Sequence, residues 1–237
     1  MLRRPVGPAP AGPAGPAGPA VLQWTADKMT SWEVRMDDAG RLEAFSDGCL
    51  AIFITIMVLG FVAPEGTRLA DLLPLAPAFG SYLLSFFAIG IYWGNHHHLL
   101  KTVTRMSASI MLANLVWLFC ISLVSFATGW MGASGAAPDT VILYQLVMIA
   151  TGLAYILLER AIIRTQRRQR EEGETCSVLA LALGGRLKER AYLALLVAGL
   201  LLAGLVRTGW AINVALLLDL LATLLWLVPD RRLEQLL

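Results

Sequence analysis

The chain has 237 residues, of which 57% are hydrophobic and only 15% are charged, and its formal net charge is +2. A soluble domain usually carries about a quarter charged residues, so this chain lacks the polar surface that water would require. The composition therefore predicts an integral membrane protein, and the small net charge gives no support for nucleic-acid binding.

The N-terminal segment is rich in glycine, proline and alanine and has no apolar core of the kind found in a signal peptide. We predict that residues 1–36 form a disordered cytoplasmic tail. The three cysteines, Cys49, Cys120 and Cys176, make no CxxC pair, so neither a disulfide framework nor a zinc site is expected.

Six apolar segments have about the 20 residues that a helix needs to cross a membrane. Their apolar runs are continuous rather than alternating, which favours helices over the strands of a barrel. We therefore predict an all-α fold, a single-repeat bundle of six transmembrane helices within residues 37–230, and a short cytoplasmic tail over 231–237. The predicted spans are Ala44–Val62, Ala78–Leu100, Ile110–Trp130, Thr140–Ile163, Ala191–Val206 and Trp210–Val228.

The distribution of lysine and arginine predicts the orientation. Of the 19 basic residues, 17 lie before the first span, in the second link, in the fourth link and its flanks, or after the sixth span, and only Arg68 and Arg207 lie in the other links. Basic residues accumulate on the cytoplasmic side of membrane proteins. This bias requires an even number of spans and predicts a plasma-membrane protein with both termini in the cytoplasm.

Polar side chains occur at a similar depth in the first three predicted spans. Because such groups are costly in lipid, we expect them to form a hydrogen-bonding network between helices. Arg41 and Asp47 are expected to pair and hold the first span against the next two. Neighbouring histidines point about 100° apart on a helix, so no metal site is expected. The network candidates are Arg41, Phe45, Ser46, Asp47, Trp93, Asn95, His96, His97 and Asn114.

Asp219 lies in the sixth predicted span. We expect it to pair with Asn213 or with a polar group of a neighbouring span. No catalytic triad, phosphate-binding loop or dinucleotide fingerprint is present, so the sequence predicts neither an enzyme nor a cofactor.

Three motifs carry a resemblance to a known family. The first span begins with Arg41 followed by Phe45-Ser46-Asp47, the second contains Ser85-Phe86 and Tyr92-Trp93-Gly94-Asn95-His96-His97, and the third contains Asn114-Leu115 and Leu118-Phe119. In this order they resemble the signatures of the transmembrane protein 175 family, the endolysosomal potassium channels and their bacterial relatives. Where the family often has Pro-Phe near the end of the third helix, this chain has Ser125-Phe126.

The resemblance implies a potassium-permeable cation channel that lacks a TVGYG filter and needs no cofactor beyond the permeant K⁺. A single-repeat chain would assemble as a homotetramer in the lipid bilayer. The family's pore is lined by the first helix, and the matching positions here are Ile52, Ile56 and Leu59, with Thr55 beside them. Four copies would stack apolar rings on one axis, and such rings gate by dewetting.

Two other functions stay open. A secondary transporter often has internal repeats and helices broken by glycine or proline. Here the signatures of spans one to three do not recur in spans four to six, and the prolines lie between spans. A membrane scaffold without transport activity is the other alternative, since the arginine-rich segment 164–170 would serve to recruit a partner.

Overall fold

The computed structural model describes the backbone of residues 19–171 and 186–227, and the side chains of residues 38–169 and 188–227. These parts of the chain contain six α-helices, two short 3₁₀ helices and no strand, which confirms the all-α prediction. The elements in chain order are α1 (Pro19–Ile56), η1 (Met57–Gly60), η2 (Leu69–Leu75), α2 (Ala76–Lys101), α3 (Ala108–Ala133), α4 (Pro138–Glu171), α6 (Arg186–Val206) and α7 (Gly209–Leu225).

Five helical segments of the described chain are long and apolar enough to cross a membrane, and α7 is shorter, with 17 residues. At 1.5 Å per residue α7 is about 26 Å long, a few Å less than a typical hydrocarbon core. The α6–α7 connection is as tight as the sequence predicts, and Arg207 makes the turn with a left-handed φ of 52°.

The first helix differs from the sequence prediction at both ends. It begins at Pro19, so residues 19–36, expected to be part of a disordered tail, are helical. The glycine- and proline-rich run stops at Pro19, and proline is well tolerated in the first turn of a helix. Residues 1–18 lie outside the described part of the chain. At the other end the α-helix stops at Ile56, and a 3₁₀ turn follows before the chain becomes extended at Phe61.

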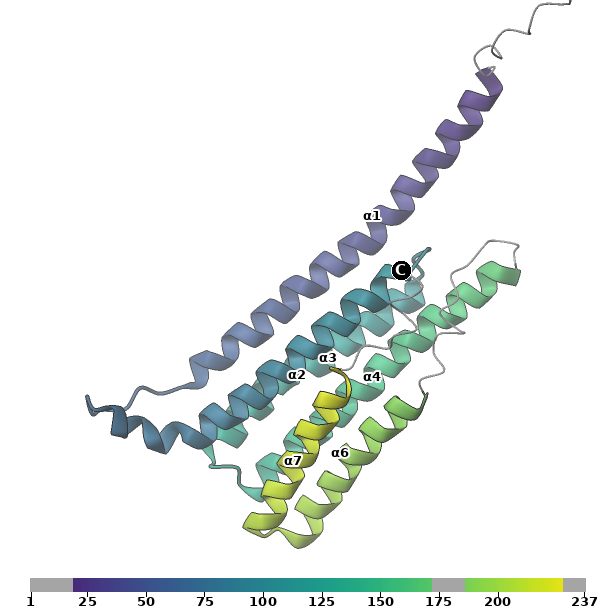
Figure 1. The fold of residues 1–237 in the computed structure, drawn as a ribbon. Coiled ribbons are helices and arrows are strands. Elements are labelled where there is room, and N and C mark those ends of the chain that lie inside the picture. Colours follow the sequence, from purple (N-terminus) through teal and green to yellow (C-terminus); the bar gives the residue numbers. More distant parts are fainter. Residues whose placement is uncertain (1–18, 172–185, 228–237) are drawn as a thin grey trace, which may run out of the picture.

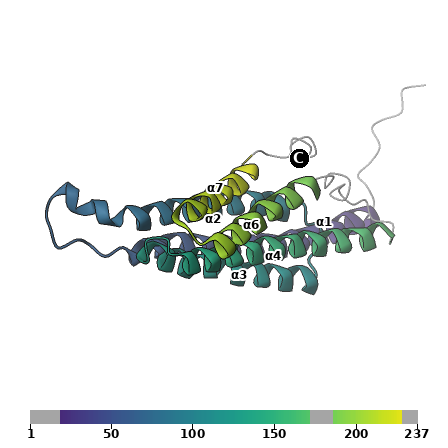
Figure 2. The same ribbon diagram turned by 90° about the horizontal axis from the view of Figure 1, so that it is seen from below.

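The helices pack side by side as an elongated bundle (Figure 1). α3 packs against α4 and α2, α6 packs against α7 and α4, and α1 contacts α2 and α3. Figure 2 shows the link between α1 and α2 extending past the ends of the other helices. The first three helices, which carry the sequence motifs, are therefore neighbours in space.

Small residues bring the helices close together at defined heights. A Cβ atom added to Gly132 would lie 2.8 Å from the Cα of Ala78, so α3 and α2 are in backbone contact there. Gly152 leaves room for the ring of Tyr192 on α6. Helices in lipid associate largely through such close packing, because no hydrophobic force distinguishes a neighbouring helix from a lipid tail.

Candidate functional site

A chain of three buried polar side chains joins α1, α3 and α2. The Ser46 hydroxyl donates to the carbonyl of Leu42 at 2.8 Å and accepts from Nδ2 of Asn114 at 2.9 Å. Oδ1 of Asn114 lies 2.7 Å from Nε2 of His96. Because the Asn114 amide group already donates to Ser46, its oxygen is left to accept, so Nε2 of His96 carries the proton. All three side chains are fully buried.

The ring of His96 also stacks on Trp117 of α3. The ring centroids are 4.5 Å apart and the planes differ by 11°. Trp117 is itself fully buried. The ring stacking and the hydrogen bond fix the position of His96 from two sides, so α2 is held in one register against α3.

A second set of contacts joins α1 directly to α2. The indole N–H of Trp93 donates to Oδ1 of Asp47 at 2.9 Å, and Nδ1 of His97 pairs with the Glu43 carboxylate. Glu43 and Asp47 are one turn apart on α1, as are Trp93 and His97 on α2, so the two pairs form one above the other.

Glu43 was not among the sequence candidates, although its spacing of four residues from Asp47 was visible in the sequence. The expected pairing of Arg41 with Asp47 is wrong: in the described structure the side chain of Arg41 is exposed and forms no ion pair with that carboxylate. Asp47 is occupied by Trp93 instead, because the indole of α2 reaches it from the packed side of α1.

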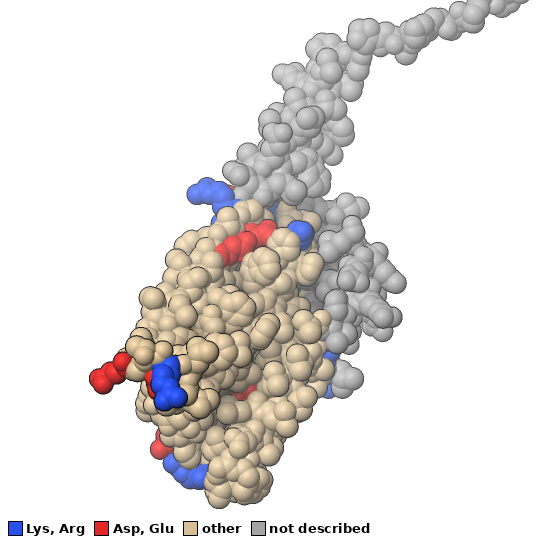
Figure 3. All heavy atoms as spheres, turned by 60° about the vertical axis from the view of Figure 1, so that its left-hand side comes forward, with Lys and Arg blue, Asp and Glu red and all other residues tan. Residues whose placement is uncertain are grey.

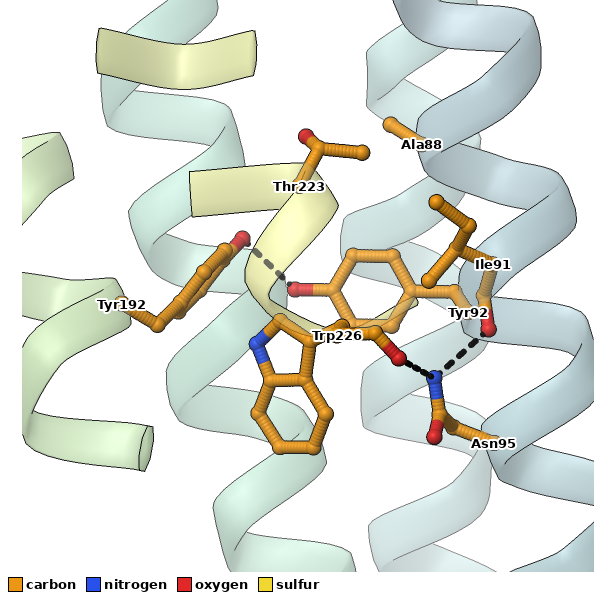
Figure 4. Close-up of a pocket in the computed structure, with 7 residues that line it drawn as sticks. All are labelled: Ala88, Ile91, Tyr92, Asn95, Tyr192, Thr223 and Trp226. Carbon is orange, nitrogen blue, oxygen red and sulfur yellow. Dashed lines mark hydrogen bonds between the residues drawn. The ribbon is translucent and has the colours of Figure 1, made fainter. Parts of the chain in front are cut away.

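Asn95 lies on the side of α2 that faces Trp226 (Figure 4). Its amide donates to the carbonyl of Ile91 at 2.9 Å and to that of Trp226, just past α7, at 3.4 Å. Two residues on a helix are about 200° apart, which places Asn95 opposite Trp93. It borders a cavity large enough for about one water molecule, beside the 2.8 Å hydrogen bond between the hydroxyls of Tyr92 and Tyr192.

Hydroxyl groups make further contacts between helices. The hydroxyl oxygen of Ser85 lies 2.6 Å from that of Thr128 and 3.3 Å from that of Tyr144. These hydrogen bonds join α2 to α3 and α4. Ser125, the residue at which the chain departs from the family pattern, donates to the carbonyl of Phe53 at 3.0 Å. A proline side chain has no donor, so this bond between α3 and α1 depends on the serine.

One face of α1 is left uncovered by the rest of the described chain. Ile52 and Ile56 are 56% and 42% exposed, and Leu59, in the turn η1 that continues α1, is 79% exposed. Thr55 is exposed on the same face, and its hydroxyl donates to the carbonyl of Ala51 at 2.9 Å. The proton of this hydroxyl thus points to its own helix, and oxygen lone pairs remain available on the outside.

The opposite face of α1 is packed. Ser46 and Leu50 on that side, and Met57 at the start of η1, are buried against the bundle. Phe45, a candidate for the polar network, is 54% exposed and lies outside it. The polar contacts therefore hold one side of α1 in place and leave the apolar stripe with Thr55 free on the other side.

Asp219 pairs with a neighbouring helix rather than with Asn213. Nε2 of Gln145 on α4 donates to Oδ2 of Asp219 at 3.2 Å, and both side chains are buried. Gly199 on α6 makes room for Gln145, since an added Cβ would lie 2.6 Å from Nε2. No spacing in the sequence could have connected two residues 74 positions apart.

Comparisons with known proteins identify similar channels. Residues 41–124 match the family described as "Endosomal/lysosomal potassium channel TMEM175". A potassium channel of Chryseobacterium sp. (strain P1-3) is 43% identical over 196 residues, which cover 83% of this chain and 96% of that protein. A potassium channel of Streptomyces collinus is 33% identical over 138 residues, covering 55% of this chain and 67% of its own length.

A solved structure has a similar fold. The crystal structure of a lysosomal potassium-selective channel TMEM175 homolog from Chamaesiphon minutus matches with a TM-score of 0.62 at 24% identity. The match covers 79% of this chain and 97% of that one. At this identity it supports the arrangement of the helices alone.

Proposed function

Because the chain belongs to the TMEM175 family of potassium channels, we propose that it is a potassium-permeable channel whose pore wall is the uncovered face of α1. The observation that carries the proposal is the division of α1 into two sides. One side is clamped to α2 and α3 by Ser46, Asp47 and Glu43, and the other exposes Ile52, Ile56 and Leu59.

A single helix face cannot enclose a pore, so the proposal requires several copies of the chain around one axis. We propose a homotetramer in the plasma membrane, with both termini in the cytoplasm and residues 37–230 as the channel domain. The 17 to 2 distribution of basic residues supports the orientation. In this arrangement four copies of α1 place three apolar rings along the axis.

The chemistry of that face suits the passage of a cation without a tightly binding filter. Apolar rings at Ile52, Ile56 and Leu59 would hold back water and ions until they widen. The oxygen of Thr55 would offer a partial replacement for a water ligand between two rings. Asp47 lies near the cytoplasmic end of the apolar part of α1 and would raise the local concentration of cations there. Passage of K⁺ then requires no resident cofactor.

The test is potassium flux from liposomes that contain the purified protein, with Ile52→Asn compared with the unchanged chain. Asparagine would wet the ring, so we expect a larger potassium flux at the same protein density. Val197→Asn on α6 is the matched control, because it places the same polar group on an exposed helix face that the proposal keeps out of the pore.

An unchanged flux in Ile52→Asn would remove this residue from the pore wall. A lack of potassium flux from the unchanged chain under every gradient would contradict the channel. Uptake that saturates and depends on a second ion gradient would indicate a coupled transporter instead.

A further inference from the structure

The segment that joins α1 to α2, residues 57–75, is here called the outer arm. It comprises η1, an extended stretch and η2. The contact of Ala78 with Gly132, at the end of α3, fixes the height of the arm, because residues before Ala78 continue past the point where α3 stops. Figures 1 and 2 both show the arm projecting beyond the neighbouring helices.

The outer arm exposes several large apolar side chains. Val62, Leu69 and Leu73 are between 73% and 86% exposed. Figure 3 brings this end of the molecule forward and shows a surface on which charged side chains are sparse. Exposed apolar patches mark surfaces that another protein or lipid covers.

The arm and α2 also line an open apolar cavity of about 690 Å³. Phe61 packs edge-on against Tyr82, with ring centroids 5.5 Å apart, and lies 6.2 Å from Phe79, so aromatic rings stabilise the wall. Val62 and Leu73 contribute further to the lining. A volume of this size accepts several side chains. Leu69, the most exposed leucine of the arm, does not line it.

The outer arm carries charged groups of both signs. Glu65 and Arg68 are both exposed and opposite in sign. Asp71 is occupied locally, because its carboxylate accepts from the backbone N–H of Arg68 at 2.8 Å. Two arms placed head to tail can therefore bring Glu65 of one copy to Arg68 of the next without like charges facing each other.

We propose that the outer arms of neighbouring copies dock head to tail, with Leu69 of one copy inserted into the cavity bounded by Val62, Leu73 and Phe79 of the next. A head-to-tail contact closes into a ring when its rotation fits the number of copies. The inference rests on the proposed function, since the same ring would surround the outer end of the α1 pore. It names the surface by which the copies of the channel recognise one another.

Disulfide trapping between differently tagged chains tests this contact. Cys49, Cys120 and Cys176 are first replaced by alanine, and a chain with Leu69→Cys is co-expressed with a chain with Val62→Cys. Oxidation in the membrane should produce a mixed dimer that carries both tags and disappears on reduction. The control pairs Leu69→Cys with Val197→Cys on α6, and it should give no mixed dimer.

A second measurement uses the charges of the arm. Glu65→Arg or Arg68→Glu alone should lower the yield of the mixed dimer by roughly twofold to fivefold, as expected for exposed ion pairs. The two reversals together in every chain should restore it. Both positions are exposed, so these variants are expected to fold.

Potassium flux from the same membranes separates the two proposals. The absence of a mixed dimer from Leu69→Cys and Val62→Cys, while flux persists, would overturn arm docking and leave the channel standing. A mixed dimer in membranes without potassium flux would support arm docking and count against the channel.

Discussion

Single polar residues within the membrane are shared between helices in this protein. Ser46, His96 and Asn114 were predictable from the sequence because each lies at a similar depth of an apolar span. Their partners within the bundle, such as Trp117 beneath His96, were not predictable. A polar side chain in an apolar span predicts that a hydrogen-bond partner exists. Which residue is the partner depends on how the helices are rotated about their axes, which the sequence does not give.

Asn114→Ala should weaken the contact between the first three helices, because it removes hydrogen bonds to both Ser46 and His96. We expect a loss of about 1 to 2 kcal/mol in the free energy of unfolding, given the modest value of such bonds in membranes. Denaturation by SDS in mixed micelles measures it. Ser122→Ala, whose hydroxyl bonds only to the carbonyl of Phe119 on its own helix, is the control and should change little.

Asp219 should tolerate loss of its charge better than loss of its oxygen atoms. Asp219→Asn keeps an acceptor for Gln145 and removes a carboxylate that would be costly in the membrane, so stability should be unchanged or slightly higher. Asp219→Ala leaves the buried amide of Gln145 without this acceptor and should cost about 1 to 3 kcal/mol. The same SDS titration compares them, and equal losses in both variants would mean that the charge itself is required.

At the scale of elements, the length of the apolar runs predicted where the helices lie, but it predicted the ends of the helices less well. The predicted second and third spans fall inside α2 and α3, because the apolar core of each helix is continuous. The start of α1 was missed, because residues 25–41, which precede the apolar part of the helix, are mostly polar. Hydropathy identifies the part of a helix within lipid and carries little information about a polar extension.

Two glycines of α3 make a matched test of helix packing. Gly132→Ala places a methyl group against the backbone of Ala78, which cannot move aside as a side chain can, so we expect a loss of about 1 to 3 kcal/mol. Gly129→Ala meets open space and should gain up to about 1 kcal/mol from better helix propensity. Unfolding in SDS distinguishes the two, and equal effects would exclude close packing as the cause.

At the scale of the whole molecule, composition and the placement of basic residues predicted a multi-pass helical membrane protein. The structure and the relatives bear out the helical membrane fold. The side of the membrane on which each end lies stays a prediction. It depends on the asymmetry of lysine and arginine, a property of the sequence that acts during insertion rather than in the folded contacts.

Labelling of single cysteines in intact cells tests this orientation. In a chain with its native cysteines replaced, Ala133→Cys at the end of α3 should react with a membrane-impermeant maleimide from outside. Lys101→Cys at the end of α2 should react only after the membrane is opened. Both positions are exposed in the chain, so access from the solvent decides the result. The reverse pattern would place both termini outside the cytoplasm.

The short 3₁₀ turn Met57–Gly60 has a geometric consequence for the end of α1. In 3₁₀ winding, residues three apart are stacked in line, whereas in an α-helix they are offset by about 60°. Rewinding these four residues as α-helix would shorten the segment by about 2 Å and swing Leu59 about 60° relative to Ile56. The alignment of Ile56 and Leu59 thus depends on the winding of this turn. That winding can change while the hydrogen bonds of Ser46 and Asp47, nearer the N-terminus of α1, stay intact.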